Sequence, residues 1–317
     1  MKTLDNSILR ILLLLFVAMC FVACGDDNDD NTRTDISEIN LNANTTTGGA
    51  DRAVSRLEMP NVDGSISSNS VLLVHRTSDT DYDADRVNYI VEWDYQKKSQ
   101  RWTCYQLHRG YTGGASGRFD GGYPQDPLLD EAYRLDQDYF YGSGFDHGHI
   151  CPNADRLGST EARDQTYYLT NMQPQYRCFN GYQGSETGLW LRLEQLLRSW
   201  QPDNNYHISD TLFICKGGTI DKEENIIKRI SGKLIVPKYF FMAVLKKSVN
   251  KEKVVSYQAI GFFMEQKNEY ATHDDLRDYA VSIDELESLT GIDFFCNLPD
   301  QIETSVEQTL KLNAWTF

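Results

Sequence analysis

Short runs of hydrophobic residues, each about the length of a β-strand, recur along the chain from residue 71 onward. Some alternate with polar residues and others are continuous, which are the patterns of half-buried and fully buried strands. The runs lie at 71–74, 88–93, 102–107, 211–215, 233–236, 239–245 and 254–263. The pattern predicts a sheet whose strands are mostly joined by turns.

Helical periodicity is confined to fewer segments. The strongest is 189–200, where the hydrophobic residues Leu189, Trp190, Leu193, Leu196, Leu197 and Trp200 fall on one face. A second helix is predicted over 282–289, because Ser282 and Glu285 have the spacing of a capping box. The sequence contains no repeat of 20 to 50 residues, which argues against a solenoid. We therefore expect one α+β domain over residues 61–317.

A hydrophobic run at 11–23 follows Lys2 and Arg10 near the start of the chain. It is shorter than a membrane-spanning helix and typical of a signal peptide, so residues 1–23 are predicted to be one. The run ends in Phe-Val-Ala-Cys at 21–24, which resembles the lipobox of bacterial lipoproteins and predicts a lipid on Cys24. An ordinary signal peptide, with Cys24 unmodified, is the alternative.

The next residues, 24–60, are rich in Asp, Asn, Thr, Ser and Gly, with the aspartates Asp26, Asp27, Asp29 and Asp30 directly after the cysteine. Such side chains bury little, so a flexible acidic tether is predicted. A lipid on Cys24 would hold the folded body at a membrane without a spanning segment. The expected location is the bacterial cell envelope, lipid-anchored at the outer membrane and surface-exposed, or else periplasmic or secreted.

Composition and charge narrow the classes of protein further. Of the 317 residues, 40% are hydrophobic and 12% aromatic, which excludes fibrous and disordered chains. The 31 basic and 46 acidic residues give a net charge of -15, which argues against a general polyanion-binding coat. Residues 149–250 nevertheless hold thirteen basic and ten acidic side chains. Any nucleic-acid role must therefore depend on a local site.

The cysteines and the common site motifs exclude several other classes. The cysteines after residue 24 are odd in number and widely spaced, at Cys104, Cys151, Cys178, Cys215 and Cys296. Their number and spacing fit neither a disulfide framework nor a zinc site, although it stays open whether two of them form one disulfide bond. The chain also lacks the motifs of lipase-type hydrolases, zincin proteases, P-loop enzymes and dinucleotide-binding proteins.

The densest chemistry lies in residues 146–156, which contain two of the six histidines. If Asp146 to His149 form a strand, alternation places His147 and His149 on the same side, and Gly148 allows a close approach. A histidine can take a proton from water near neutral pH, and a nearby amide or carboxylate oxygen suits Mg²⁺. These parts are compatible with a metal-assisted hydrolase, although two such histidines are also common as packed or surface residues.

These residues resemble the motifs of the DNA/RNA non-specific endonuclease family, secreted bacterial nucleases with a ββα-metal core. The family's D-R-G-H, S-N-x-x-P-Q and F-N-x-G-x-W-x-x-L-E motifs correspond to Asp146-His147-Gly148-His149, 170–175 and 179–194. Further similar segments follow in order over residues 70–300. The resemblance implies an α+β ββα-metal (His-Me finger) fold, with a mostly antiparallel central sheet flanked by helices. It also implies hydrolysis of phosphodiester bonds in both DNA and RNA.

The resemblance also implies roles for single residues. His149 corresponds to the general base, and Asn180 to the one side chain that binds a single Mg²⁺, with Mn²⁺ as another divalent ion. Glu194 corresponds to the acid that orients metal-bound water, and Asn171 to a residue that shapes the site. Arg118 is the best match for the arginine that steadies the transition-state phosphate, because it precedes an Asp-Pro pair. Three of these residues also have a purely structural interpretation. In it, Asn180 caps a loop, Glu194 is an exposed helix carboxylate and Arg118 forms a surface ion pair.

Two departures from the family pattern bear on activity. His147 stands where the motif has Arg, which leaves a weaker, pH-dependent cation in place of a permanent one. Ten positions separate Asn180 from Trp190, where the pattern has four, so it is open whether Asn180 still faces Glu194. Glu186, inside the insertion, is an alternative metal-shell residue.

These departures keep two other functions in play beside the nuclease. One is an envelope lipoprotein on the same fold that binds nucleic acid or glycan with weakened or lost catalysis. The other is a hydrolase for smaller phosphodiesters.

Overall fold

The computed structural model describes residues 38–46, 51–62, 69–78, 85–112, 114, 119–201, 211–250 and 252–317. The predicted signal peptide, Cys24 and the first part of the predicted tether lie outside this range. No helix in the described part is long and apolar enough to cross a membrane.

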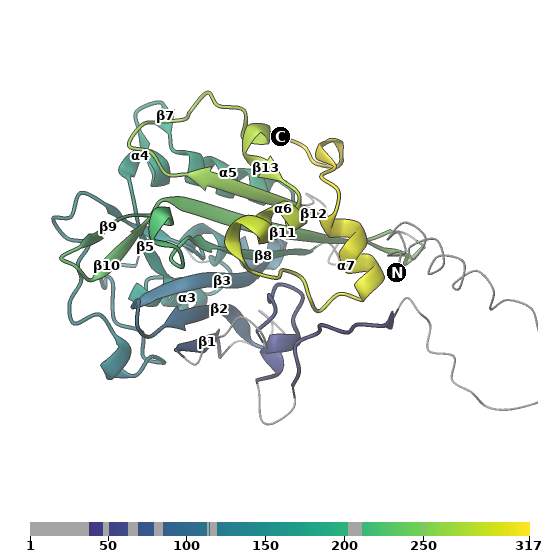
Figure 1. Ribbon diagram of the computed structural model, residues 1–317, viewed down its shortest axis with the longest axis horizontal. Helices are drawn as coiled ribbons and strands as arrows, with labels where there is room; N and C mark the ends of the chain where they lie inside the picture. Colours follow the sequence, from purple (N-terminus) through teal and green to yellow (C-terminus); the bar gives the residue numbers. More distant parts are fainter. Residues whose placement is uncertain are drawn as a thin grey trace, which may run out of the picture. The chain divides into compact units, whose positions relative to one another are not determined.

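A seven-stranded antiparallel sheet forms the centre of the fold, in the order β1-β2-β3-β8-β11-β12-β13 (Figure 1). Its strands are β1 (Ser70–Arg76), β2 (Val87–Asp94), β3 (Ser99–Leu107), β8 (Thr211–Gly218), β11 (Tyr239–Val249), β12 (Val255–Glu265) and β13 (Ala280–Val281). Six of the seven hydrophobic runs lie in this sheet. The seventh is β10 (Leu234–Pro237), which pairs with β9 (Ile226–Ile230). The predicted α+β class with a mostly antiparallel sheet is confirmed.

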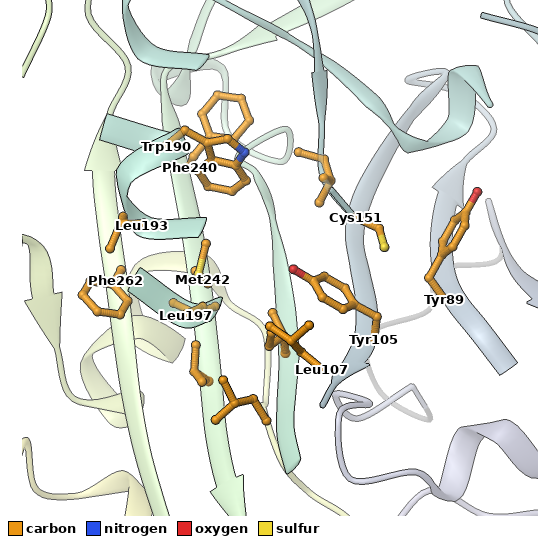
Figure 2. Packing of buried hydrophobic residues seen from close by; sticks show 14 of the residues in the cluster. Tyr89, Tyr105, Leu107, Cys151, Trp190, Leu193, Leu197, Phe240, Met242 and Phe262 are labelled. Atoms are coloured by element: carbon orange, nitrogen blue, oxygen red, sulfur yellow. The ribbon is translucent and has the colours of Figure 1, made fainter. Parts of the chain in front are cut away.

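Helices cover both faces of the sheet, which explains why its central strands read as continuous hydrophobic runs. On one face, α5 (Leu189–Ser199) packs Trp190, Leu193 and Leu197 against strands β11 and β12, as Figure 2 shows. On the other face, α6 (Ile283–Thr290) and α7 (Asp300–Glu307) lie over residues of the opposite pleat. Successive residues of β11 divide between the two cores, with Phe240 in the first and Phe241 in the second.

Both predicted helices are present. Helix α5 begins and ends within one residue of the expected bounds, and its hydrophobic face is buried. Helix α6 starts at the predicted cap, where the Ser282 hydroxyl accepts a hydrogen bond from the Glu285 N–H at 3.2 Å. It ends at Gly291, whose left-handed backbone (φ 74°) suits glycine.

The remaining elements lie in the connections. They are η3 (Arg52–Ser55), α2 (Arg109–Thr112), η4 (Glu131–Tyr133), β4 (Asp146–His149), η5 (Asn153–Asp155), α3 (Thr160–Gln165), η6 (Leu169–Asn171), β5 (Met172–Gln175), α4 (Arg177–Asn180), β6 (Tyr182–Gln183), β7 (Glu186–Thr187), η7 (Glu223–Asn225), η8 (Leu276–Tyr279) and η9 (Leu312–Ala314). The five cysteines after residue 24 are free thiols.

The folded body begins earlier than the sequence suggested. Asn40 Nδ2 donates hydrogen bonds to the carbonyls of Cys296 and Leu298, at 2.8 and 2.6 Å. Asn44 is itself buried and donates to two further carbonyls, and Met59 is completely buried. The prediction of a tether up to residue 60 is therefore wrong for the described residues 38–46 and 51–60. Polar composition misled here, because the asparagines satisfy buried backbone groups instead of facing water.

Candidate active site

Strand β4 carries both histidines and pairs antiparallel with β5, so residues 146–149 form the strand that the sequence analysis considered. Asp146 lies opposite Gln175 and His149 opposite Met172. A Cβ atom on Gly148 would lie 2.3 Å from Cδ of the Gln175 side chain, so this position accepts only glycine while Gln175 stays in place. The chain then turns into α4, which returns to contact β4. Two strands and a following helix therefore bring the 146–149 motif and Asn180 together.

His149 and Asn180 line one pocket at the surface of this ββα unit. Arg177 and Asp146 contribute its charged groups, and aromatic side chains form much of the rest of the wall. The full lining is Tyr123, Phe140, Tyr141, Gly142, Phe145, Asp146, His147, His149, Arg177, Asn180, Gly181 and Tyr182. The two residues that the resemblance assigns to proton transfer and metal binding thus share one cavity.

Neighbouring groups hold His149 from two sides. Its backbone carbonyl accepts a hydrogen bond from Nε1 of Trp190 on α5, at 3.2 Å. Its ring meets Tyr167 edge-on, with the ring centroids 5.0 Å apart and an interplanar angle of 88°. The imidazole is thus held by packing, which suits a group that must keep one orientation toward a substrate.

Asn180 is oriented by the charges beside it. Its Nδ2 donates to Oδ2 of Asp146 at 3.4 Å, and the same carboxylate pairs with Arg177, whose Nε lies 2.8 Å away. With the amide nitrogen directed at Asp146, the amide oxygen is the atom that the side chain can offer to a cation. A neutral amide oxygen in a polar pocket, with a carboxylate beside it, fits a hard, hydrated divalent ion.

His147 is built into the pocket wall. Its Nε2 lies 2.8 Å from Oδ2 of Asp138, and its ring lies between two aromatic rings. The Tyr123 ring stacks on it with centroids 3.6 Å apart, and the Phe140 ring at 4.3 Å. A histidine packed in this way braces the aromatic wall, and Arg177 is the guanidinium that lines the pocket.

Asn171 joins the chain after β4 to the turn before β5. It is completely buried, and its Oδ1 accepts the Cys151 N–H at 2.8 Å. Its Nδ2 donates to the carbonyls of Cys151 and Thr166, at 2.9 and 2.8 Å. These contacts fit the predicted site-shaping role, because they fix the backbone on both sides of the two strands.

Glu194 faces the protein interior rather than the pocket. It is 8% exposed, and Oε1 lies 2.9 Å from Nζ of Lys216, which is itself completely buried on β8. Lys216 Nζ also lies 4.5 Å from the centre of the Trp190 ring. Burial raises the pKa of Glu194, while Lys216 and then Arg198 oppose that rise. The alternative of a solvated helix carboxylate does not hold.

The insertion between Asn180 and Trp190 loops out of the helical unit. Residues 182–187 form the β6–β7 hairpin, and the Gly188 N–H donates to the Gly181 carbonyl at 2.7 Å across its base. The two ends of the hairpin lie next to each other, so its six residues do not separate α4 from α5, and the two helices remain in contact. Glu186 accepts a hydrogen bond from the Thr272 hydroxyl at 2.8 Å and does not line the pocket.

Replacing Gly188 with alanine is expected to lower the free energy of unfolding by about 1–3 kcal/mol and to reduce cleavage. A Cβ here would lie 2.3 Å from the Phe179 carbonyl oxygen, so the backbone beside Asn180 must shift. Urea denaturation and a cleavage assay measure the two effects. Ser185→Ala, in the exposed hairpin turn, is the control. Unchanged stability in Gly188→Ala would show that the hairpin base does not hold α4.

Sequence reasoning missed much of the pocket wall. Arg177, Tyr141 and Tyr182 lie in segments without hydrophobic periodicity, and nothing in their spacing marked them. The aromatic run at 139–141, next to the 146–149 motif, was the available signal. Arg118 lies outside the residues that the structure describes.

The antiparallel sheet with this ββα unit and pocket defines the fold as that of ββα-metal nucleases. The chain belongs to the DNA/RNA non-specific endonuclease family, whose model matches residues 68–301. A nuclease of Nostoc sp. is 31% identical over 221 residues, covering 69% of this chain and 75% of that protein. Nuclease C1 of Cunninghamella echinulata var. echinulata is 26% identical, covering 68% and 82%. The mitochondrial nuclease EXOG of Xenopus laevis is also 26% identical, covering 67% and 58%.

A solved structure supports the fold independently. A chain in the crystal structure of the EndoG/EndoGI complex, described as showing the mechanism of EndoG inhibition, superposes with a TM-score of 0.54. It covers 71% of this chain and 86% of that chain at 19% identity.

Proposed function

We propose that this protein is a sugar-non-specific endonuclease that hydrolyses phosphodiester bonds in DNA and RNA with a single Mg²⁺ ion. The observation that carries the proposal is the placement of His149 and Asn180 in one pocket, in a chain of this family. Asn180 would hold the ion through its amide oxygen. When bound, the ion would neutralise charge that develops on the scissile phosphate and the leaving oxygen.

The protein's own side chains supply the other parts of the reaction. His149 takes a proton from the attacking water, and the packing of its ring against Tyr167 keeps its direction fixed. Arg177, 65% exposed and anchored on Asp146, is placed to contact a substrate phosphate. Glu194 is held by Lys216 in the interior and does not line the pocket, so the role of an acid that orients water at the ion is not assigned to it.

The two sequence departures do not favour a protein with lost catalysis. His147 is used to brace the aromatic wall, and the insertion forms a hairpin that leaves α4 against α5. Neither removes His149 or Asn180 from the pocket. No feature of the described residues favours smaller phosphodiesters over long strands.

Metal removal and restoration test the proposal. The purified protein should cut both supercoiled plasmid and folded RNA, stop when EDTA is present, and recover when excess Mg²⁺ is added. Asn180→Ala should lose most of this activity at low Mg²⁺. A folded, Mg²⁺-loaded protein that leaves both polymers intact would contradict the proposed function.

Two tyrosines at the pocket are expected to contact bases of the substrate. Tyr141 and Tyr182 are each 70% exposed and line the pocket. Base–aromatic stacking contributes about 1–3 kcal/mol per base, so alanine at either position should raise KM for single-stranded DNA about fivefold or more. Phenylalanine should preserve KM, because it keeps the ring.

The matched measurement compares KM for a single strand and for its duplex. Duplex cleavage should change less, since duplex bases already stack on one another. Tyr133→Ala is the control, because Tyr133 is exposed but stacks on Tyr95 outside the pocket. Equal KM values in all the variants would exclude stacking on the pocket tyrosines.

We also propose that a lipid on Cys24 anchors the protein at the bacterial cell envelope. The support is the sequence alone, namely the signal-like run at 11–23 and the lipobox-like residues that end it.

A further inference from the structure

Three carboxylates come together on the face of the sheet opposite α5. Asp284 and Glu287 lie on α6, and Glu307 lies at the end of α7. One oxygen from each of the three lies within 4.8 Å of the others. None of them lines the pocket that holds His149 and Asn180.

The buried member of this cluster lacks a partner. Glu307 is only 8% exposed, and its Oε1 accepts no hydrogen bond from any described residue. A buried carboxylate oxygen without a donor is costly, so native proteins normally pair it or bind a cation there. The carboxylate that carries this atom also places an oxygen within 4.8 Å of oxygens of Asp284 and Glu287.

The surroundings add negative charge instead of relieving it. Burial, reinforced by Glu287 and then Glu303, raises the pKa of Glu307 to about 10. Burial also raises the pKa of Glu287 to about 7; the Phe294 N–H that it accepts opposes this rise, and Asp293 and Asp284 add to it. No lysine or arginine among the described residues forms an ion pair with any of the three carboxylates. The missing counter-charge must come from protons or from a bound cation.

We propose that Asp284, Glu287 and Glu307 bind a hard divalent cation of the calcium class, which ties α6 to α7. Ca²⁺ takes oxygen ligands at about 2.3–2.6 Å, so oxygens on opposite sides of the ion lie about 5 Å apart. Mg²⁺ ligands lie at about 2.0–2.1 Å and can be only about 4 Å apart. One oxygen from each carboxylate lies within 4.8 Å of the others, inside the span across Ca²⁺. Three protein carboxylates also suit Ca²⁺ better than Mg²⁺, which usually keeps several waters and takes one or two carboxylates. Water would complete its coordination on the exposed side, at Asp284.

Calcium titration of the Asn180→Ala protein tests this site, because that background removes the ligand proposed for the catalytic ion. Isothermal titration calorimetry with CaCl₂ should show one bound ion, and saturating CaCl₂ should raise Tm by several degrees. Glu307→Gln in the same background should abolish both effects. Glu285→Gln should keep them, because Glu285 is an exposed acid on α6 outside the cluster.

The Tm values of the calcium-free proteins give a second test, in which the substitution should raise Tm. Without calcium at neutral pH, Glu307→Gln should raise Tm, because the carboxyl, whose pKa burial raises to about 10, must take up a proton when the protein folds and glutamine needs none. Glutamine at a carboxylate that only accepts structural hydrogen bonds would lower Tm. If Glu307→Gln does not fold, Glu287→Gln, at a half-buried position, provides the calcium titration alone, because Glu287 Oε1 also accepts the Phe294 N–H at 2.8 Å and its calcium-free Tm is not a matched comparison.

Three results would overturn the proposal. They are no heat and no Tm shift when CaCl₂ is added to the Asn180→Ala protein, an undiminished shift in Glu307→Gln and Glu287→Gln, and an equal shift with Mg²⁺. The last would remove the assignment to calcium.

Discussion

Replacing His149 with alanine is expected to lower kcat about 10²–10⁴-fold on both plasmid DNA and RNA, the range for loss of a general base. KM should change little, because Arg177 and the aromatic wall, which contact the substrate, stay in place. The fold should also remain, since the hydrogen bond that Trp190 Nε1 donates goes to the His149 backbone carbonyl and survives the substitution. Initial rates under saturating Mg²⁺ measure the effect.

The matched control for this variant is His273→Ala. His273 is exposed and does not line the pocket, so its loss should leave kcat unchanged. If His149→Ala keeps kcat within a few fold of the wild type on both polymers, another group must take the proton, and the role of His149 is wrong.

Replacing Lys216 with alanine is expected to lower the free energy of unfolding by about 3–5 kcal/mol. The substitution leaves Glu194 buried without its partner 2.9 Å away and opens a cavity beneath the Trp190 ring. Breaking one side of a buried ion pair costs far more than replacing the pair, because the remaining charge is desolvated. Urea denaturation followed by tryptophan fluorescence measures the loss.

The double variant Lys216→Met with Glu194→Gln separates stability from catalysis. It should recover most of the lost stability, because neither position is then charged. It should also keep cleavage, because Glu194 does not line the pocket and the exchange leaves His149 and Asn180 in place. A single Lys216→Ala variant as stable as the wild type would show that the pair contributes nothing. Loss of cleavage in a stable double variant would instead assign Glu194 a part in the reaction.

The sequence predicted the regular part of the fold well because periodicity is a local property. The runs at 88–93 and 239–245 are strands with both faces covered, and their continuous hydrophobicity shows it directly. The helix at 189–200 was equally clear, since its hydrophobic face repeats with the helical period. His149 and Asn180, the residues proposed for proton transfer and metal binding, were found through the family motif, and both line one pocket.

The failures come from contacts between residues far apart in the chain. Asn40 was predicted to lie in a flexible tether, yet its side chain donates hydrogen bonds to the carbonyls of Cys296 and Leu298. No local pattern can reveal such a distant contact. The sequence predicted only that His147 is a weaker cation than arginine. Its packing role was missed because its partners Tyr123 and Phe140 lie in an irregular loop. Lys216 read as part of a strand, and only the fold shows that it pairs with Glu194 from a different element.

Anomalous diffraction from crystals of the protein soaked in Mn²⁺ tests the central claim most directly. The account predicts an ion bonded to the amide oxygen of Asn180, within the pocket that His149 lines, whatever else binds at α6 and α7. An Asn180 amide without an ion, or a His149 ring turned away from an ion that is present, would contradict it.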